Sequence, residues 1–388
     1  MSDVADFVRQ HVMPAEAVLD AGGPRAVQAM LDLRGKARAA GLWALPLPVE
    51  LGGGGLELRD YFAVAEAEGS SDHGPAALGS ASLLDVRMIS EYGSPAVRAR
   101  YLGPLVSGEI SGSYAMTEPD VAGSAPTMIR TTASRVRDGW VVTGRKWFTS
   151  GARTAAYATV LARTGPEQLS LLTVPTDQPG FRVVRELPVM GAAGQSEVEL
   201  AGVVVPADHV LGAPGDGLAI ASTRLALGRT LRCLRWIGQA QRAFELMCRR
   251  ANDRRIQSGP LAGQQLVQQM VFDSLLAVRS ARALAGQAAD LVAGGQQAKT
   301  EIGLAKVAAA RALHQVTDAA IQIHGAEGLT SDTPLPMLAG LGRAARILDG
   351  PDELHIGATA RRVLRQFQAE RAEEGSPDQR VPGGDATR

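Results

Sequence analysis

Hydrophobic and polar residues follow two different periods along this chain, and the period changes twice. Over residues 1–112 the apolar positions recur every three or four residues, with Gly and Pro between the runs, which predicts an N-terminal α-helical domain. Over residues 113–217 the runs have strand length, and Asp138-Gly139 separates two of them as in a β-hairpin turn. We expect this second segment to be a small, mainly antiparallel β domain.

The helical period returns after residue 217, in longer runs. Segments with apolar stripes predict four long helices: 231–251, 266–278, 302–323 and 354–367. The expected C-terminal domain, residues 218–370, is therefore a four-helix bundle, and its Ala-rich faces allow close approach of the helices. The last segment, residues 371–388, is polar and rich in Gly and Pro, so we expect it to be disordered.

Strands do not alternate regularly with helices in this pattern. The chain is therefore expected to be of the α+β class and not a doubly wound nucleotide-binding fold. One glycine-rich string, Gly340 to Ala345, matches a relaxed dinucleotide fingerprint. It follows a Pro-rich turn instead of a strand, so we do not interpret it as a nucleotide site.

Composition and charge narrow the range of partners. The 388 residues carry 40 basic and 40 acidic side chains, so the chain has no net positive charge that would favour binding to a nucleic acid or an anionic membrane. No run of 18 apolar residues and no signal-peptide pattern is present, and two cysteines are too few for a disulfide framework. We expect a cytoplasmic protein that binds neither nucleic acid nor membrane. The six histidines lack metal-ligand spacing, so no metal site is expected.

The stretch RILDGPDELHIG, residues 346–357, places a single carboxylate, Asp349, directly before Gly350 and Pro351. Pro suits the start of a helix, and Asp352 and Glu353 would then lie in the positive first turn. Two interpretations are open for Asp349. It is either a helix cap, which these residues alone favour because Asp is a common N-cap, or an acid presented at a hinge for chemistry.

Two further motifs lie in the predicted β domain, YAMTEPDVAGS at 114–124 and GRKWFTSG at 144–151. Together with RIQSG at 255–259, IQIHGAEG at 321–328 and DGPDELH at 349–355, they resemble the acyl-CoA dehydrogenase family. The resemblance extends over nearly the whole chain, in the order and spacing of the family. It implies the same three-part fold and an FAD cofactor.

A flavin ring is a flat apolar plate with a polar edge, so its site needs hydrogen-bond donors and an aromatic wall. The resemblance places the donors at the Met116 backbone, Thr117, Ser124 and Thr149, and the wall at Trp147. Without the neighbouring motifs, Trp147 would be interpreted as a buried strand residue.

The family completes each FAD site with residues of a second subunit, so a homodimer or homotetramer is implied. By resemblance the remaining cofactor-binding positions are Arg254, Gln257, Gln265, Gln322, Gly325, Pro351 and Glu353. The sequence departs from the family pattern at three positions: Gln257 stands where Phe is usual, Ala125 where Asp is usual, and Ala326 where a second Gly is usual.

The resemblance also gives Asp349 a role. In the family an acid at this position removes the α-proton of an acyl thioester while flavin N5 accepts the β-hydride, and Arg229 and Ser124 would contact the thioester. The position used for the base in another branch is Gly228, which has no side chain. Most members carry Glu, which is longer than Asp by one C–C bond of roughly 1.5 Å. The backbone must therefore bring Asp349 closer, or the substrate must bind differently.

The predicted function is FAD-dependent α,β-dehydrogenation of an acyl-CoA or acyl-carrier thioester, with an electron acceptor such as electron-transfer flavoprotein. Two alternatives stay open: a flavin monooxygenase or N-hydroxylase of the same fold, and a non-redox acyl-thioester binding protein. Ala125, Gln257 and Ala326 favour the non-redox alternative, whereas Asp349, Trp147 and Thr149 oppose it. His355 is expected on a helix surface, although it could line the site.

Overall fold

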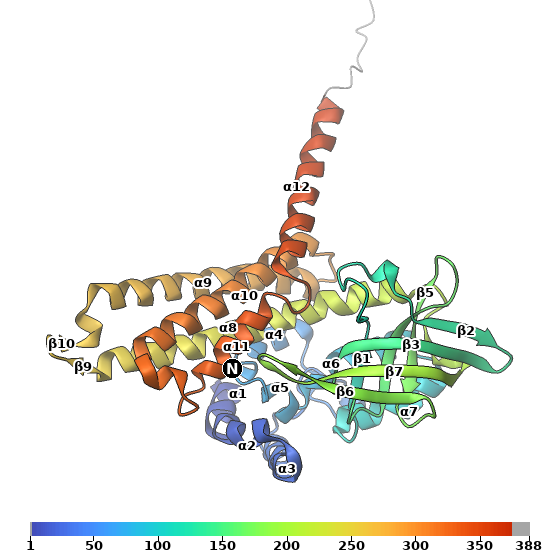
Figure 1. Cartoon of the computed structure of the whole chain (residues 1–388), viewed down its shortest axis with the longest axis horizontal. Helices are drawn as coiled ribbons and strands as arrows, with labels where there is room; N and C mark the ends of the chain where they lie inside the picture. Colours follow the sequence, from blue (N-terminus) through green and yellow to red (C-terminus); the bar gives the residue numbers. More distant parts are fainter. Residues whose placement is uncertain (1, 375–388) are drawn as a thin grey trace, which may run out of the picture.

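The computed structural model describes residues 2–374, which form three packed parts (Figure 1). An N-terminal helical part is followed by an eight-stranded sheet and then by long helices. Figure 1 shows the sheet at one end of the long helices, with the N-terminal helices packed against both. The α+β fold with helical, β and helical parts that the sequence predicts is confirmed.

The N-terminal part consists of short helices around one apolar core. Helix α7 illustrates the local signals: Ser94 accepts a hydrogen bond from Val97 N at 3.2 Å, Pro95 starts the helix, and Gly108 ends it in a left-handed conformation. The helices are α1 (Ser2–Phe7), η1 (Val8–Val12), η2 (Met13–Ala15), α2 (Glu16–Ala21), α3 (Gly23–Ala39), η3 (Val49–Leu51), α4 (Leu58–Glu68), α5 (Gly74–Ala77), η4 (Ser80–Ser82), α6 (Leu83–Tyr92) and α7 (Pro95–Ser107).

The middle part is a mainly antiparallel sheet with strand order β6-β7-β3-β2-β4-β5-β8, in which β1 pairs in parallel with β4. The predicted hairpin is present, because Val136 of β2 pairs with Gly139 of β3 across the turn. The elements are β1 (Gly112–Ala115), η5 (Pro126–Met128), β2 (Thr132–Val136), β3 (Gly139–Ser150), β4 (Tyr157–Arg163), β5 (Leu169–Pro175), β6 (Phe181–Val189), β7 (Ala192–Pro206), η6 (Ala207–His209) and β8 (Val210–Leu211).

The long helices pack closely because small residues line their contacts. On α10, Ala305, Ala309 and Leu313 are all buried, as the Ala-rich pattern predicts. The elements of this part are α8 (Gly217–Asp253), β9 (Arg255–Ile256), β10 (Gly259–Pro260), η7 (Leu261–Gly263), α9 (Gln265–Ala293), α10 (Lys299–His324), η8 (Gly325–Leu329), α11 (Leu335–Ala345) and α12 (Asp352–Glu374).

Helix α11 was not predicted, and it contains the glycine-rich string that resembled a nucleotide fingerprint. Its glycines serve packing. A Cβ on Gly342 would lie 2.9 Å from the His314 Cα of α10, and Gly340 lies against the backbone of Gly191 at the tip of the β6–β7 hairpin. The absence of a side chain therefore lets α11 approach both α10 and the sheet.

Helix α12 differs from the predicted fourth bundle helix. Its first half lies against α10, where Arg362 donates a hydrogen bond to Thr300 at 3.0 Å, while its second half projects from the body (Figure 1). The helix continues to Glu374, four residues into the segment 371–388 for which we expect disorder, and residues 375–388 lie outside the described residues. Within residues 2–374, no helix combines the length and apolarity needed to cross a membrane.

Ion pairs join the N-terminal helices to the long helices. Glu16 of α2 pairs with Arg242 of α8 at 2.7 Å, and Asp85 of α6 pairs with Arg224 of α8 at 3.1 Å, all with largely buried side chains. Removing one partner of such a pair would leave the other charge poorly solvated. These contacts hold α2 and α6 against α8, and α6 and α8 together line a cleft.

Candidate active site

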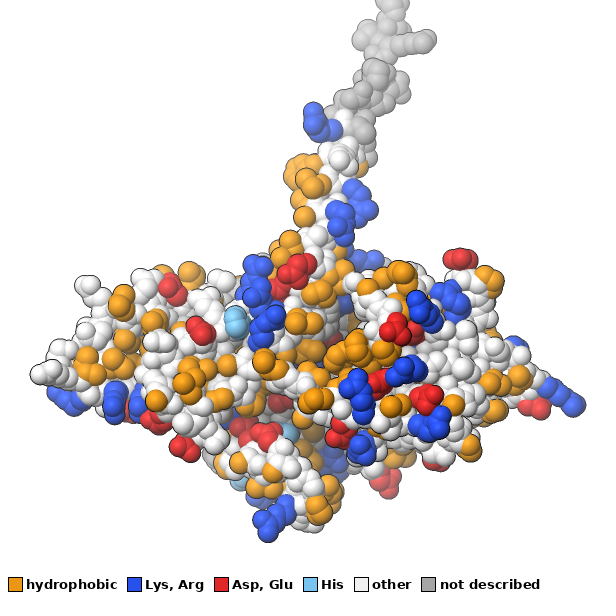
Figure 2. All heavy atoms as spheres, viewed as in Figure 1, with side chains coloured by type: hydrophobic (Ala, Val, Ile, Leu, Met, Phe, Trp, Pro, Cys, Tyr) orange, Lys and Arg blue, Asp and Glu red, His pale blue; other side chains and the backbone are white. Residues whose placement is uncertain are grey.

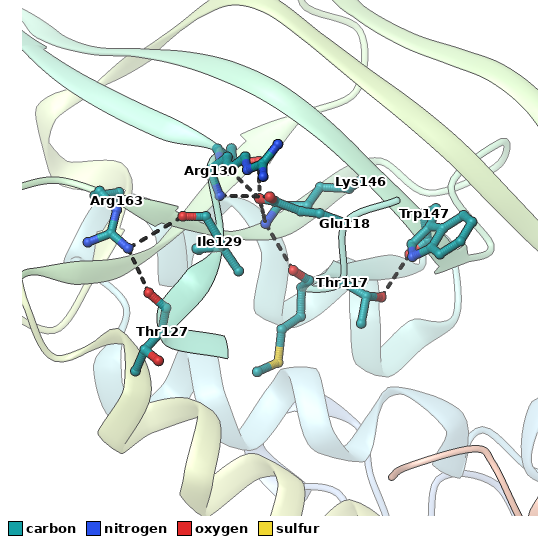
Figure 3. Close-up of polar contacts among 10 residues, drawn as sticks. Thr117, Glu118, Thr127, Ile129, Arg130, Lys146, Trp147 and Arg163 are labelled. Carbon is teal, nitrogen blue, oxygen red and sulfur yellow. Dashed lines mark hydrogen bonds and ion pairs between the residues drawn. The ribbon is translucent and has the colours of Figure 1, made fainter. Parts of the chain in front are cut away.

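An irregularity in strand β3 presents the predicted flavin residues. The pairing of β3 with β7 shifts between Lys146 and Thr149, and Phe148 has a φ of +49°. The loop after β1 follows this bulge closely: Trp147 N donates to Thr117 O, and Thr117 Oγ1 donates to Trp147 O, both at 3.0 Å (Figure 3). The bulge therefore brings two sequence motifs into one surface.

A buried ion pair lies next to this surface (Figure 3). Lys146 Nζ lies 3.0 Å from Glu118 Oε1 and donates to Met116 O at 2.9 Å, and neither charged side chain is appreciably exposed. Glu118 also accepts hydrogen bonds from the backbone N–H groups of Arg130 and Thr131, at 2.7 and 2.9 Å. Sequence reasoning did not assign a role to Glu118 or Lys146.

Burial has the largest influence on the pKa values of both members of this pair. It lowers the pKa of Lys146 to about 8, although Glu118 opposes the shift. Burial alone would raise the pKa of Glu118, but Lys146 and the hydrogen bonds from Thr131 and Arg130 lower it overall. The pair thus holds the loop after β1 against β3 with a charged network.

The residues at this surface fit a flavin. Thr149 is buried, and its Oγ1 has no hydrogen-bond partner among the described residues, so it is free to bind a polar group of a ligand. Trp147 is partly exposed, with its ring centroid 4.8 Å from that of Phe148, and is not a fully buried core residue. Met116 and Thr117 are partly buried beside it, whereas Ser124 lies exposed in the following loop.

The second half of the site is the turn between α11 and α12. Asp349 and Gly350 both have left-handed backbone conformations, with φ of +56° and +100°. The Asp349 carbonyl accepts hydrogen bonds from Arg229 Nε at 3.0 Å and His355 Nε2 at 3.1 Å. Its carboxylate is about one third exposed and lies 3.5 Å from Arg232 Nε.

Asp349 is not at the N-cap position of α12. The helix begins at Asp352, and the carbonyl of Pro351 accepts the first helical hydrogen bond, from Leu354 N at 3.0 Å. The cap interpretation, which the local sequence favoured, is therefore wrong. Pro351 is partly buried at this boundary, and Glu353 is exposed in the first turn.

Asp352 anchors the start of α12 instead. Its carboxylate is 1% exposed and pairs with Lys306 at 3.4 Å, Arg311 at 3.3 Å and Arg346 at 3.0 Å. Burial alone would raise the pKa of Asp352, but the hydrogen bond from Arg346 and the charge of Lys306 lower it overall. This network holds the helix that follows Asp349 against α10.

A cleft of about 580 Å³ lies between α6, α8, the α9–α10 connection and α12. Its size is in the usual range for small-molecule sites. The lining includes Leu84, Leu227, Ile302 and Leu354, together with Arg229 and His355. His355 is only 7% exposed, so the expectation of a helix-surface position is wrong.

The residues predicted to reach a neighbouring flavin lie far from Trp147 in the same chain. Arg254 and Gln257 flank or form the β9–β10 hairpin, which Figure 1 shows at the end of the long helices opposite the sheet. Gln322 and Gly325 lie at the same end, because Arg250 of α8 pairs with Glu327 just beyond α10. These residues and Gln265 are all exposed. One chain therefore does not bring the two predicted groups together.

The three-part fold, the flavin-compatible surface and the acid beside a cleft define a flavin-dependent oxidoreductase. The chain matches the N-terminal, middle and C-terminal domain models of acyl-CoA dehydrogenases over residues 1–109, 113–203 and 215–364. The chain belongs to the acyl-CoA dehydrogenase family.

Individual relatives agree with this assignment. The chain is 39% identical to the probable acyl-CoA dehydrogenase FadE2 of Mycobacterium tuberculosis, over 93% of each protein. It is 34% identical to human acyl-CoA dehydrogenase family member 11 over 95% of this chain, and it spans about half the length of that relative.

Solved structures show the same fold. A structure described as a candidate acyl-CoA dehydrogenase from Mycobacterium abscessus has a TM-score of 0.88 and 35% identity, covering 94% of this chain and 97% of the other. An acyl-CoA dehydrogenase from Bacillus anthracis complexed with FAD has a TM-score of 0.81 and 25% identity. The match covers 95% of this chain and 66% of the other. The protein is a flavoenzyme, and its cofactor is FAD.

Proposed function

We propose that the protein catalyses FAD-dependent α,β-dehydrogenation of an acyl-CoA thioester and that Asp349 is the base. One observation carries this proposal: Asp349 is a partly exposed carboxylate at a left-handed turn, and the two side chains that hold its carbonyl also line the cleft. A cap or surface residue would not need this arrangement.

The side chains of this chain then have distinct tasks. Asp349 removes the α-proton of the thioester, and the apolar residues of the cleft exclude water around the acyl chain. Met116, Thr117, Trp147 and Thr149 bind and orient the cofactor. FAD, when bound, supplies the acceptor for the β-hydride. Ser124 and Arg229 are proposed to contact the thioester, and the oxidant that regenerates FAD is proposed to be an electron-transfer flavoprotein.

Substitution of Asp349 by Asn tests the role of the base. Asn tolerates the left-handed conformation at least as well as Asp, so Asp349→Asn removes the charge and leaves the turn intact. We expect FAD to stay bound, while anaerobic flavin reduction by acyl-CoA slows by about 10²–10⁴-fold. Asp332→Asn, at an exposed position between α10 and α11, is the matched control with an unchanged rate. Wild-type reduction by the Asp349→Asn protein would exclude Asp349 as the base.

We further propose that the active assembly is at least a homodimer. The exposure of Arg254, Gln265 and Gln322, far from Trp147, supports a role for them at a neighbour's FAD. Exposed apolar residues support further subunit contacts: Leu266 and Phe272 on α9, and Leu364 and Phe367 on α12. Figure 2 shows hydrophobic side chains along the projecting part of α12.

Light scattering on the FAD-loaded protein tests this assembly. We expect a mass of at least two chains, and a single 40.6 kDa species with FAD bound would overturn the proposal. Co-expression gives a sharper test. Asp349→Asn and Arg254→Ala chains are each expected to be impaired alone. Mixed dimers should recover part of the activity, because each contains one site with an intact Asp349 and an intact Arg254 from the neighbour.

A further inference from the structure

We propose that His355 is a positioning residue for Asp349: its Nε2–H holds the Asp349 carbonyl and so directs the carboxylate toward the substrate. The inference rests on the proposed function, because it assigns a role to His355 through the base. It concerns the orientation of a backbone segment and does not make His355 itself an acid or a base.

The backbone of Asp349 needs support from outside the turn. A non-glycine residue with positive φ is uncommon, although Asp tolerates the conformation better than most residues. Here it is followed by a second left-handed residue, Gly350. The direction of the Asp349 carbonyl is set by this backbone, and the donors that contact it are Arg229 Nε at 3.0 Å and His355 Nε2 at 3.1 Å. Any rotation of the turn would weaken both hydrogen bonds.

The His355 ring also leaves no room for a side chain at position 350. A Cβ placed on Gly350 would lie 2.9 Å from His355 Nε2 and 2.9 Å from Leu354 Cδ2. The ring therefore packs directly against the backbone of Gly350 while it hydrogen-bonds to Asp349. One side chain on the first turns of α12 thus fixes both left-handed residues.

The hydrogen bond determines the tautomer of His355. A carbonyl oxygen can only accept, so Nε2 carries the hydrogen. Burial lowers the pKa of His355; its hydrogen bond to Asp349 opposes this effect, and the charge of Arg229 adds to it. The ring therefore stays neutral near pH 7. It supplies a hydrogen bond without adding a positive charge beside the Asp349 carboxylate, which already faces Arg232.

Such support matters more for Asp than for Glu. The shorter side chain has less reach, so the position of its backbone determines where the carboxylate lies. A misplacement of about 1 Å at a reacting group can cost on the order of 100-fold in rate. His355 also lines the cleft, so the ring that holds the base lies at the wall of the proposed acyl site.

Two substitutions separate the hydrogen bond from the packing. His355→Gln places an amide N–H near the position of Nε2, whereas His355→Leu fills similar space without a donor. We expect His355→Leu to keep FAD and thioester binding but to slow anaerobic flavin reduction by about 10–100-fold. The kcat should fall much more than KM changes, and His355→Gln should recover most of the rate. His73→Leu, at a surface pair with Asp20 in the N-terminal part, is the control and should leave the rate unchanged.

A non-oxidisable thioester gives a readout of proton removal alone. A 3-thiaacyl-CoA has an acidic α-carbon but no β C–H bond, and its enolate produces a long-wavelength absorbance band beside oxidised flavin. We expect this band to form more slowly, or to a smaller extent, in His355→Leu and to return in His355→Gln. Thermal unfolding of each variant reports whether the fold is intact.

A ¹⁵N NMR spectrum of histidine-labelled wild-type protein tests the inference if His355→Leu does not fold. His355 should give the pattern of a neutral ring protonated at Nε2 at pH 7. A ring protonated at Nδ1, or a charged ring, would overturn the inference.

The other outcomes are equally distinct. Wild-type rates in His355→Leu, or equal losses in His355→Leu and His355→Gln, would overturn the positioning role and leave the proposed function intact. If no acyl-CoA reduces the wild-type flavin, the proposed function fails and this inference fails with it.

Discussion

For the substitution Glu118→Gln, the structure predicts both the loss in the free energy of unfolding and the pH dependence of that loss. In the wild type, Lys146 is fully buried and its pKa is about 8, compared with 10.5 for an ordinary lysine. At pH 7 the ammonium is charged and pairs with Glu118 at 3.0 Å. When the charge of Glu118 is removed, burial disfavours the ammonium further and the pKa of Lys146 falls.

The loss of stability caused by leaving the Lys146 charge unpaired has an upper limit, because Lys146 can release its proton. At pH 7 deprotonation of the folded wild type costs about 1.4 kcal/mol, since the pKa lies about one unit above that pH. In the wild type both carboxylate oxygens of Glu118 accept hydrogen bonds, from Arg130 N and Thr131 N. The Gln amide replaces one of these oxygens by an NH₂ donor, so one buried N–H loses its acceptor, which costs about 1–3 kcal/mol. We therefore expect a loss of about 2–4 kcal/mol in the free energy of unfolding at pH 7.

The sign of the pH dependence follows from the same pKa. Because the folded pKa of Lys146 is below its unfolded value, folding releases the proton between about pH 8 and 10.5, and this group favours folding increasingly across that window. Above pH 8 the lysine is already neutral in the folded wild type, so the charge part of the stability gap between wild type and variant disappears. Below pH 8 the gap widens by up to about 1.4 kcal/mol per pH unit.

Urea unfolding of both proteins between pH 6 and pH 9 measures this gap. Glu186→Gln is the matched control, because Glu186 of β6 forms an exposed ion pair with Arg153, and such pairs contribute at most about 1 kcal/mol. Glu118→Gln should also bind FAD more weakly, since Lys146 holds the Met116 carbonyl. A gap that is independent of pH, or no larger than that of the control, would refute the reasoning.

Three further predictions follow from the packing of the chain. Gly342→Ala should lower the melting temperature and cost about 1–3 kcal/mol, because its Cβ would meet the α10 backbone, whereas Gly103→Ala, in open space within α7, should stabilise the protein slightly. A thiol reagent should not modify Cys233 in the native protein, because burial raises its pKa to about 12; only Cys248 should react, and reaction of both thiols before unfolding would contradict this. Asp349→Glu should retain FAD and measurable flavin reduction with an altered preference for acyl chain length, and complete inactivity would show that the left-handed turn accepts only the shorter acid.

The sequence predicted those features that depend on local patterns. The change from a helical to a strand period located the sheet, and Asp138-Gly139 marked a real hairpin. The Ala-rich stripe of residues 302–323 became the buried face of α10. These features are local because each depends on residues a few positions apart.

Features that depend on distant contacts could not be predicted. Glu118 and Lys146 are 28 positions apart in sequence, and a charged pair in a polar stretch is usually on the surface. Contact between β3 and the loop after β1 buries them together. His355 was expected on a helix surface because the sequence does not show that its ring packs against Gly350 and bonds to the Asp349 carbonyl. Helix α11 was missed because its glycines weaken the helical signal, although they serve its packing.

The two halves of the site are connected through backbone contacts at α11. Trp147 and Thr149 lie on β3, which pairs with β7, and the tip of the β6–β7 hairpin meets α11 where a Cβ on Gly191 would lie 2.3 Å from the Gly340 carbonyl carbon. Helix α11 then leads directly into the turn that carries Asp349. Backbone-to-backbone contact leaves little freedom, because no side chain can adjust between the two elements. The position of Asp349 relative to the proposed flavin-binding surface is therefore determined by the sheet as well as by the helices around the cleft.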